Sequence, residues 1–149
     1  MEKPRVLIAD DNEATCALVA AILRRDFETE IATDGIEAIE KLRVLQYAAV
    51  LLDLRMPHVD GFAVLQFLQD ERPDVLSRVI VLTASLTKLE TDRVHTFPVC
   101  GIIAKPFEIE SLLAAVKQCA SRHTHSRNPL LSGGMILLLA DLLGHRWIG

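Results

Sequence analysis

Residues 48–61 have the sequence AAVLLDLRMPHVDG, in which an unbroken apolar run ends at Asp53. A continuous apolar run of this length is typical of a strand that is buried on both faces, as in a parallel sheet. Pro57 and Gly61 bracket the next few residues, and both residue types favour turns. Apolar residues then recur at helical spacing over residues 64–68. The segment therefore predicts a buried strand, a loop that begins with an acid, and a helix.

Other apolar runs in the chain also end in a residue that can handle a phosphoryl group. Including the run that ends at Asp53, the residues at these ends are Asp10 with Asp11, Asp53, Thr83 and Lys105. In an open parallel α/β sheet, ligands bind outside the carboxyl ends of the strands, so residues that follow strands are expected to converge. Three carboxylates, a hydroxyl and an ammonium at one sheet edge describe a site for a divalent cation and a phosphate. The pattern predicts a phosphoryl acceptor.

Strands and helices are expected to alternate along the whole chain. Strands are predicted at residues 6–9, 28–32, 48–52, 78–82 and 100–104. Helices are predicted up to about residue 25, around 38–45 and 64–68, over 87–97, and over 109–120. In the first helix, the expected buried face consists of Ala14, Leu18, Ala21 and Ile22. Five strand–helix pairs predict an α/β fold with a doubly wound parallel sheet and right-handed crossovers.

Length and composition favour one domain with a tail. The chain has 149 residues, half of them hydrophobic, which is enough for one core and leaves little room for a second. We expect a domain over residues 1–121, and then residues 122–149 as a polar linker with a short hydrophobic end. The apolar part, residues 135–143, is interrupted by Asp141 and is too short to span a bilayer, so no transmembrane segment is expected.

Charge and cysteine content narrow the function classes further. The formal net charge is −4 and no basic stripe is present, so direct binding of nucleic acid is not expected. The three cysteines are odd in number and form no CxxC pair. They are expected to be reduced thiols of a cytoplasmic protein, since no signal peptide precedes the first strand.

Four motifs together resemble the receiver domain of bacterial two-component response regulators. They are Asp10-Asp11, the segment from Asp53 to Gly61, Thr83-Ala84 and Lys105-Pro106-Phe107, in the family's order and spacing. The resemblance implies a flavodoxin-like (βα)₅ fold with strand order 2-1-3-4-5. It also implies a single-domain response regulator that receives a phosphoryl group from a histidine kinase or a histidine phosphotransfer protein. Such a domain is a signalling module rather than an enzyme, beyond phosphorylating itself from small donors and removing its own phosphate.

The acidic cluster also has a chemical reason to bind a metal. A carboxylate is a poor nucleophile toward an anionic phosphoryl donor, so the site needs a cation that brings the two together. Mg²⁺ prefers oxygen ligands, which Asp10, Asp11 and Asp53 can provide. The resemblance implies that Asp11 binds Mg²⁺ directly, that Asp10 does so through water, and that the backbone carbonyl of Arg55 completes the set. Mg²⁺ is therefore the expected cofactor.

The resemblance also assigns roles to the remaining polar residues. Asp53 is the expected phosphoacceptor. Lys105 is expected to balance charge on the phosphoryl oxygens, and the Thr83 hydroxyl is expected to donate to one of them once the acyl phosphate has formed. The Lys105-Pro106 peptide bond is expected to be cis, so that the lysine can point into the site.

Each of these residues also has an ordinary structural interpretation. An Asp-Asp pair after a strand can be a helix N-cap, and Asp53 before Met-Pro can belong to a turn. A haloacid-dehalogenase-like phosphatase also uses a strand-end Asp with Thr and Lys, but that family needs a second Asp two residues later, where this chain has Arg55. A third possibility is a degenerate receiver that binds proteins without being phosphorylated.

Two departures from the receiver pattern concern how the signal is passed on. Many receivers have an aromatic residue three positions before the lysine, and this chain has Ile102 there. Isoleucine cannot make the same rotameric switch. Phe97-Pro98-Val99 replaces a common small-residue segment, and Pro98 is expected to end the preceding helix early. The cognate kinase, the stimulus and the downstream target cannot be inherited from the family.

Overall fold

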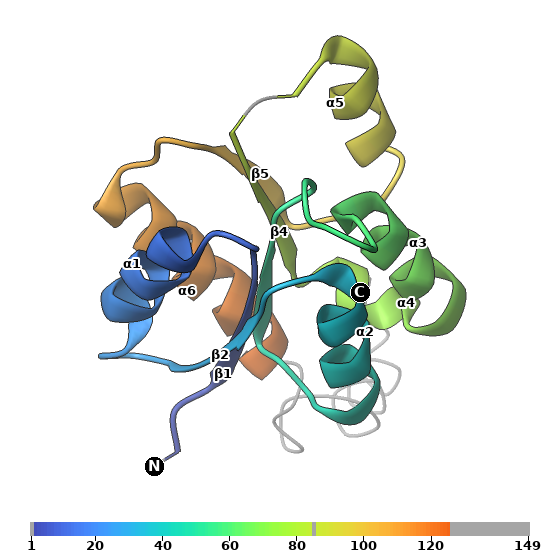
Figure 1. Ribbon diagram of the computed structural model, residues 1–149. Helices are drawn as coiled ribbons and strands as arrows, with labels where there is room; N and C mark the ends of the chain where they lie inside the picture. Colours follow the sequence, from blue (N-terminus) through green and yellow to red (C-terminus); the bar gives the residue numbers. More distant parts are fainter. Residues whose placement is uncertain (1, 85, 126–149) are drawn as a thin grey trace, which may run out of the picture.

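The computed structural model describes residues 2–84 and 86–125, which form a five-stranded parallel sheet with helices on both faces (Figure 1). The strand order is β2-β1-β3-β4-β5, so the flavodoxin-like arrangement expected from the sequence is confirmed. The strands are β1 (Arg5–Ala9), β2 (Glu28–Ala32), β3 (Ala49–Leu52), β4 (Val79–Thr83) and β5 (Gly101–Ala104). All four neighbouring pairs are parallel, which places the carboxyl ends of the strands at one edge of the sheet.

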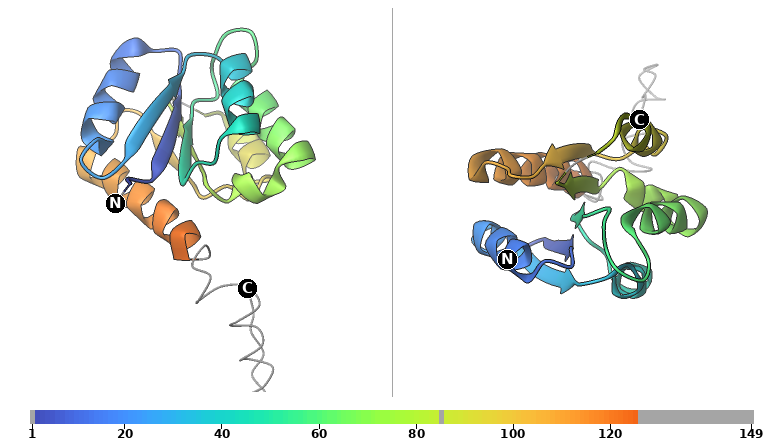
Figure 2. Two further views of the ribbon diagram at one scale, coloured as in Figure 1. Left: turned by 90° about the horizontal axis from the view of Figure 1, so that it is seen from below. Right: turned by 45° about the horizontal axis from the view of Figure 1, so that its top comes forward.

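Helices connect successive strands and divide between the two faces of the sheet. They are α1 (Glu13–Leu23), α2 (Gly35–Val44), α3 (Gly61–Glu71), α4 (Pro73–Leu76), α5 (Lys88–Val94) and α6 (Ile109–His125). Helices α1 and α6 cover one face, and α2, α3 and α5 cover the other, which both views in Figure 2 also show. The sheet is thus buried on both sides, as the apolar strands require.

Two apolar cores lie on opposite faces of the sheet. In β1, Leu7 and Ala9 point into the core beneath α2 and α3, while Val6 and Ile8 point into the core beneath α1 and α6. Because side chains alternate along a strand, one continuous apolar run supplies both cores. Burying each large apolar side chain contributes about 1.5–3 kcal/mol, so these two layers hold the strand ends in place.

The buried face of α1 differs from the expected one. The residues that α1 buries are Cys16, Val19 and Leu23, whereas Leu18 is 48% exposed. Ala14 and Ala21 are also exposed. Ile22, the fourth residue of the predicted face, is half-buried and packs against the core beneath α1 and α6. The prediction was wrong for the other three because α1 is apolar on nearly every side, so its spacing does not single out one face.

The second half of the chain shows further differences from the predicted elements. The four-residue helix α4 was not expected, because it is too short to show a period, although a proline occupies its first turn. Helix α5 ends at Val94, three residues short of the predicted 97 and before Pro98, in agreement with the early end expected from that proline.

Helix α6 continues to His125, so residues 122–125, expected to begin a linker, extend this helix. The apolar run expected at residues 135–143 lies outside the residues that the structure describes. Within residues 2–84 and 86–125, no helix has the length and apolar character needed to cross a membrane.

Candidate functional site

The predicted site residues gather at the carboxyl edge of the sheet. Asp10, Asp53 and Lys105 each directly follow a strand, and Thr83 is the last residue of β4. Backbone hydrogen bonds continue the strand pairing past the strands: the amide of Asp53 donates to Ala9 O at 2.9 Å, and that of Lys105 to Thr83 O at 2.9 Å. The sheet therefore fixes the backbone from which each of these side chains starts.

Three carboxylates form one compact cluster at this edge. One carboxylate oxygen from each of Asp10, Asp11 and Asp53 lies within 4.8 Å of the others. Asp10 and Asp53 are buried, at 2% and 7% exposure, whereas Asp11 is exposed. Hard oxygen donors at this spacing fit a divalent cation such as Mg²⁺. With one ammonium beside them, the three acids leave an excess of negative charge that a cation would balance.

The aspartate pair does not serve as the cap of α1. Asn12 is the N-cap, and its side-chain oxygen accepts a hydrogen bond from the amide of Thr15 at 2.9 Å. The Oδ1 atom of Asp10 accepts from the amide of Asn12 at 2.9 Å, which orients that carboxylate. The capping interpretation of Asp10-Asp11 is therefore not needed.

Lys105 bridges two of the acids. Its Nζ lies 2.6 Å from Asp10 Oδ2 and 3.5 Å from Asp53 Oδ2. Burial lowers the pKa of Lys105, but the hydrogen bond to Asp10 and the charges of Asp53 and Asp10 outweigh burial, so the net pKa is raised. The ammonium is therefore fully charged at neutral pH. The Lys105-Pro106 bond is cis, as predicted from the resemblance.

The environment of Asp53 disfavours the charged form of its carboxylate. Burial raises its pKa above the ordinary value of 3.8, and the nearby charge of Asp10 raises it further. A hydrogen bond from the backbone amide of Arg55, at 3.2 Å to Oδ1, and the charge of Lys105 lower it, but the net pKa is raised. Additional positive charge at the cluster would relieve this cost.

Thr83 brings a buried hydroxyl to the same edge. The side chain is 2% exposed, and among the residues described its Oγ1 atom has no hydrogen-bond partner. Buried hydroxyls are normally paired, so an unpaired one is a candidate for binding a ligand. A phosphoryl oxygen is one acceptor that could satisfy it.

The loop after Asp53 is folded tightly against the strand. A Cβ atom added to Gly61 would lie 2.5 Å from Asp53 O and 2.6 Å from Leu54 Cα, so only glycine fits there. The amide of Gly61 donates to Leu54 O at 3.0 Å, and Asp60 caps α3 by accepting from Ala63 N at 2.9 Å. This packing fixes the position of the Asp53 backbone from the loop side.

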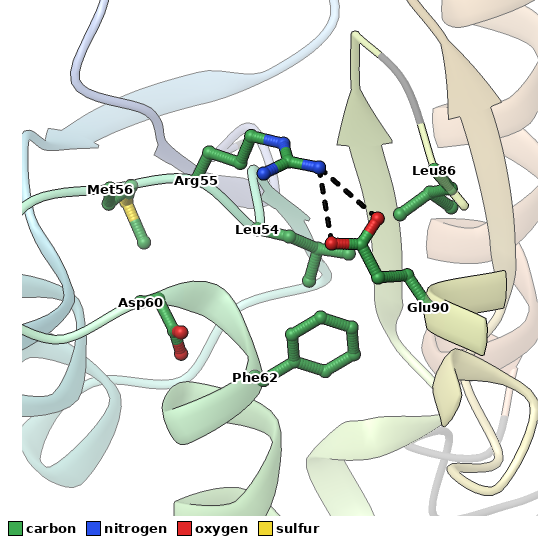
Figure 3. Close-up of a pocket in the computed structure, with 7 residues that line it drawn as sticks. All are labelled: Leu54, Arg55, Met56, Asp60, Phe62, Leu86 and Glu90. Atoms are coloured by element: carbon green, nitrogen blue, oxygen red, sulfur yellow. Dashed lines mark hydrogen bonds and ion pairs between the residues drawn. The ribbon is translucent and has the colours of Figure 1, made fainter. Parts of the chain in front are cut away.

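A cavity of about 300 Å³ lies between the loop after β3 and the start of α5 (Figure 3). Its lining residues are Leu54, Arg55, Met56, Asp60, Phe62, Leu86 and Glu90. The side chains of Arg55 and Glu90 point toward each other, with Arg55 Nη2 3.1 Å from Glu90 Oε1. From the sequence, Arg55 was expected to contribute its backbone carbonyl, and its side chain argued only against a phosphatase; Glu90 was not predicted as a site residue. The Thr-x-x-Glu spacing from Thr87 to Glu90, a capping-box pattern, was the available signal.

Ile102 lies on β5, where it pairs in register with Val81 of β4. It is half-buried and packs against the core beneath α2 and α3. At the usual position of the receiver aromatic residue, this chain therefore has an aliphatic residue that belongs to the sheet packing.

Known proteins resemble this chain in sequence. A family model described as the response regulator receiver domain matches residues 6–117. The DNA-binding dual master transcriptional regulator RpaA of Synechocystis sp. is 30% identical over 154 residues, covering 98% of this chain and 63% of RpaA. The chain thus spans less than two thirds of that regulator, and it spans 48% and 23% of two further curated relatives.

Solved structures resemble the chain in fold. The receiver domain of the Francisella response regulator 1452 is 25% identical and has a TM-score of 0.73. The match covers 81% of this chain and 99% of that domain. The receiver domain of the sensor histidine kinase PA1611 from Pseudomonas aeruginosa PAO1 is 22% identical, with a TM-score of 0.72 and coverage of 80% and 98%. The PA1611 domain was solved with a magnesium ion coordinated in its active site cleft.

Proposed function

This chain belongs to the family of response regulator receiver domains, and on that premise we propose that Asp53 accepts a phosphoryl group from a histidine kinase or a histidine phosphotransfer protein. The observation that carries the proposal is the arrangement around Asp53. Its buried carboxylate shares one cluster with the oxygens of Asp10 and Asp11, and the Lys105 ammonium lies 3.5 Å away. This combination suits an acid that must approach an anionic donor.

The transfer exchanges one bond to phosphorus for another. A carboxylate oxygen of Asp53 attacks the phosphorus of the phosphohistidine, the P–N bond breaks, and its electron pair returns to the imidazole nitrogen. Asp53 then carries a mixed acyl phosphate. Lys105 offsets negative charge on the phosphoryl oxygens, and the Thr83 hydroxyl, which has no partner among the described residues, donates to one of them.

The proposal includes a Mg²⁺ site made by Asp10, Asp11, Asp53 and the backbone carbonyl of Arg55. When bound, Mg²⁺ supplies positive charge that draws the donor phosphate toward the carboxylates. The donor set supports this assignment, since all the proposed ligands are oxygens. The magnesium ion in the related PA1611 receiver domain is consistent with it.

We further propose that the receiver unit ends with α6. The family match ends at residue 117, and α6 continues to His125. All the proposed site residues precede α6. The phosphoryl-accepting activity is therefore assigned to the receiver unit alone.

The experiment that tests the function uses a small phosphodonor. The purified protein is incubated with acetyl phosphate and Mg²⁺, and the intact mass is measured with and without a chelator. The mass of one phosphoryl group should appear only with Mg²⁺, and it should be absent from Asp53→Asn. Equal labelling of wild type and variant would refute the assignment of Asp53. Turnover of simple phosphomonoesters would instead favour a phosphatase.

A further inference from the structure

An ion pair connects the loop after Asp53 to the start of α5. The Nη2 atom of Arg55 donates to both Oε1 and Oε2 of Glu90, each at 3.1 Å. Figure 3 shows the two side chains meeting across the cavity. We call this pair the Arg55–Glu90 clasp. It joins a loop residue two positions after the proposed phosphoacceptor to a helix that is distant in sequence.

The Glu90 end of the clasp is held firmly. Thr87 and Glu90 form a capping box at the start of α5: Thr87 N donates to Glu90 Oε2 at 2.9 Å, and Glu90 N donates to Thr87 Oγ1 at 3.1 Å. The hydrogen bond from the Thr87 amide, together with the charge of Arg55, lowers the pKa of Glu90. The carboxylate is therefore charged at neutral pH and fixed to the helix.

The Arg55 end of the clasp is close to the acceptor and easily moved. The backbone amide of Arg55 donates to Asp53 Oδ1 at 3.2 Å, so the arginine side chain starts beside the carboxylate. Its side chain is 59% exposed, and a single nitrogen makes both contacts to Glu90. Exposed pairs of this kind are weak, so a better anion can compete for the guanidinium.

Helix α5 depends on few other contacts on this side. Val94 is its one buried residue, and Leu89 is 81% exposed. Besides the clasp, the Arg93 guanidinium lies over the Phe62 ring of α3, with Cζ 4.0 Å from the ring centroid. Two arginine contacts thus join α5 to the loop and helix that follow Asp53. A change in one of them can alter how the start of α5 is held.

We propose that Glu90 is a positioning residue that holds the Arg55 guanidinium, and that a phosphoryl group on Asp53 competes with Glu90 for this guanidinium. The proposal rests on the phosphorylation of Asp53 proposed above. A phosphoryl group carries up to two negative charges and three acceptor oxygens, and arginine binds such groups strongly. When Arg55 turns to the phosphoryl group, the clasp opens and the start of α5 is released. This route to α5 does not need an aromatic residue at position 102.

The main test is the lifetime of the acyl phosphate in Glu90→Gln. Glutamine also completes a capping box, so α5 should keep its cap while Arg55 loses its charged partner. A freed guanidinium binds the phosphoryl oxygens more of the time and shields them from water. The lifetime of the acyl phosphate should therefore be about two- to five-fold longer than in wild type. This is the range expected from the free energy of an exposed ion pair. Arg55→Gln should shorten the lifetime. In the Arg55→Gln background, Glu90→Gln should have no effect.

The matched control is Glu71→Gln, which breaks the exposed Arg43–Glu71 pair of 3.4 Å between α2 and α3. It should leave the lifetime unchanged. A second measurement is amide hydrogen exchange in residues 90–94. Phosphorylation should speed exchange there in wild type, whereas in Glu90→Gln exchange should already be fast and change little.

The outcomes separate this inference from the proposed function. If wild type acquires no phosphoryl group, both fail. If wild type is phosphorylated but Glu90→Gln has the wild-type lifetime, or has the same effect with and without Arg55, the competition for Arg55 is wrong and the function of Asp53 still holds. Unchanged hydrogen exchange in α5 on phosphorylation would also overturn the release of that helix.

Discussion

The Asp53 carboxylate is buried among other acids, and the cost of its charge gives a pH-dependent prediction. Because its folded-state pKa is raised above 3.8, the folded protein binds this proton more tightly than the unfolded chain does. The contribution of Asp53 to stability therefore falls as the pH rises from about 4 through the folded pKa. Asn copies the neutral form. Without metal, Asp53→Asn should be more stable than wild type at pH 7, with a difference that vanishes below about pH 4.

Thermal unfolding between pH 3 and pH 8 in a chelating buffer measures this difference. Glu40→Gln, at an exposed position, is the control and should follow wild type at every pH. Saturating Mg²⁺ should remove the advantage of Asp53→Asn, because the bound cation stabilises the charged form. A variant that is less stable than wild type at pH 7 without metal would show that the Asp53 charge is well compensated in the folded state.

Thr83 gives a second prediction at the residue scale. Its buried Oγ1 lacks a partner among the described residues, and leaving a polar group unpaired costs folding free energy. Thr83→Val keeps the shape and removes the hydroxyl, so the free energy of unfolding in denaturant should rise by about 1 kcal/mol. If the variant is instead destabilised, the hydroxyl has a partner in the resting protein.

At the scale of elements, Gly61 at the start of α3 explains how Asp53 is positioned. An alanine Cβ there would lie 2.5 Å from Asp53 O, and backbone atoms cannot move aside easily. Gly61→Ala should lower the free energy of unfolding by about 1–3 kcal/mol and weaken phosphorylation. The control is Gly101→Ala in β5, where an added Cβ meets nothing within 4 Å. Equal stability of the two variants would show that the loop has room to move.

The helices show where the spacing of apolar residues in the sequence predicts the buried face and where it does not. Helix α3 buries Val64, Leu65 and Leu68, as their spacing indicates. In α1 the apolar residues surround the helix, and the sheet packing rather than the period selects the buried face. Helix α5 has one buried residue and depends on polar contacts, so hydrophobic periodicity has little to detect there.

For the whole molecule, the separation of the receiver unit from the rest of the chain can be tested by truncation. A chain that ends after His125 keeps α6 whole. It should accept a phosphoryl group at the wild-type rate, with an unfolding temperature within a few degrees of wild type. Rate and unfolding temperature are measured on both chains under the same conditions. A folded truncated protein that no longer accepts phosphate would place part of the site in residues 126–149.

The fold and the placement of the acidic cluster were predictable because both follow from strand ends. Apolar runs mark buried parallel strands, and parallel strands end at one edge, so Asp10, Asp53 and Lys105 had to converge. The Arg55–Glu90 clasp could not be predicted in this way. It joins an exposed loop side chain to a half-buried side chain of α5, and its geometry depends on how the β3–α3 loop folds against α5, which no local pattern specifies.

Locating the phosphoryl group within the chain decides whether Asp53 is the acceptor. Protein treated with acetyl phosphate and Mg²⁺ is reduced with borohydride, which converts an aspartyl phosphate to homoserine, and the peptides are analysed by mass spectrometry. We expect homoserine at position 53, and none at Asp10 or Asp11. Homoserine at either of those positions, or a phosphorylated protein with an unmodified residue 53, would contradict the proposed function.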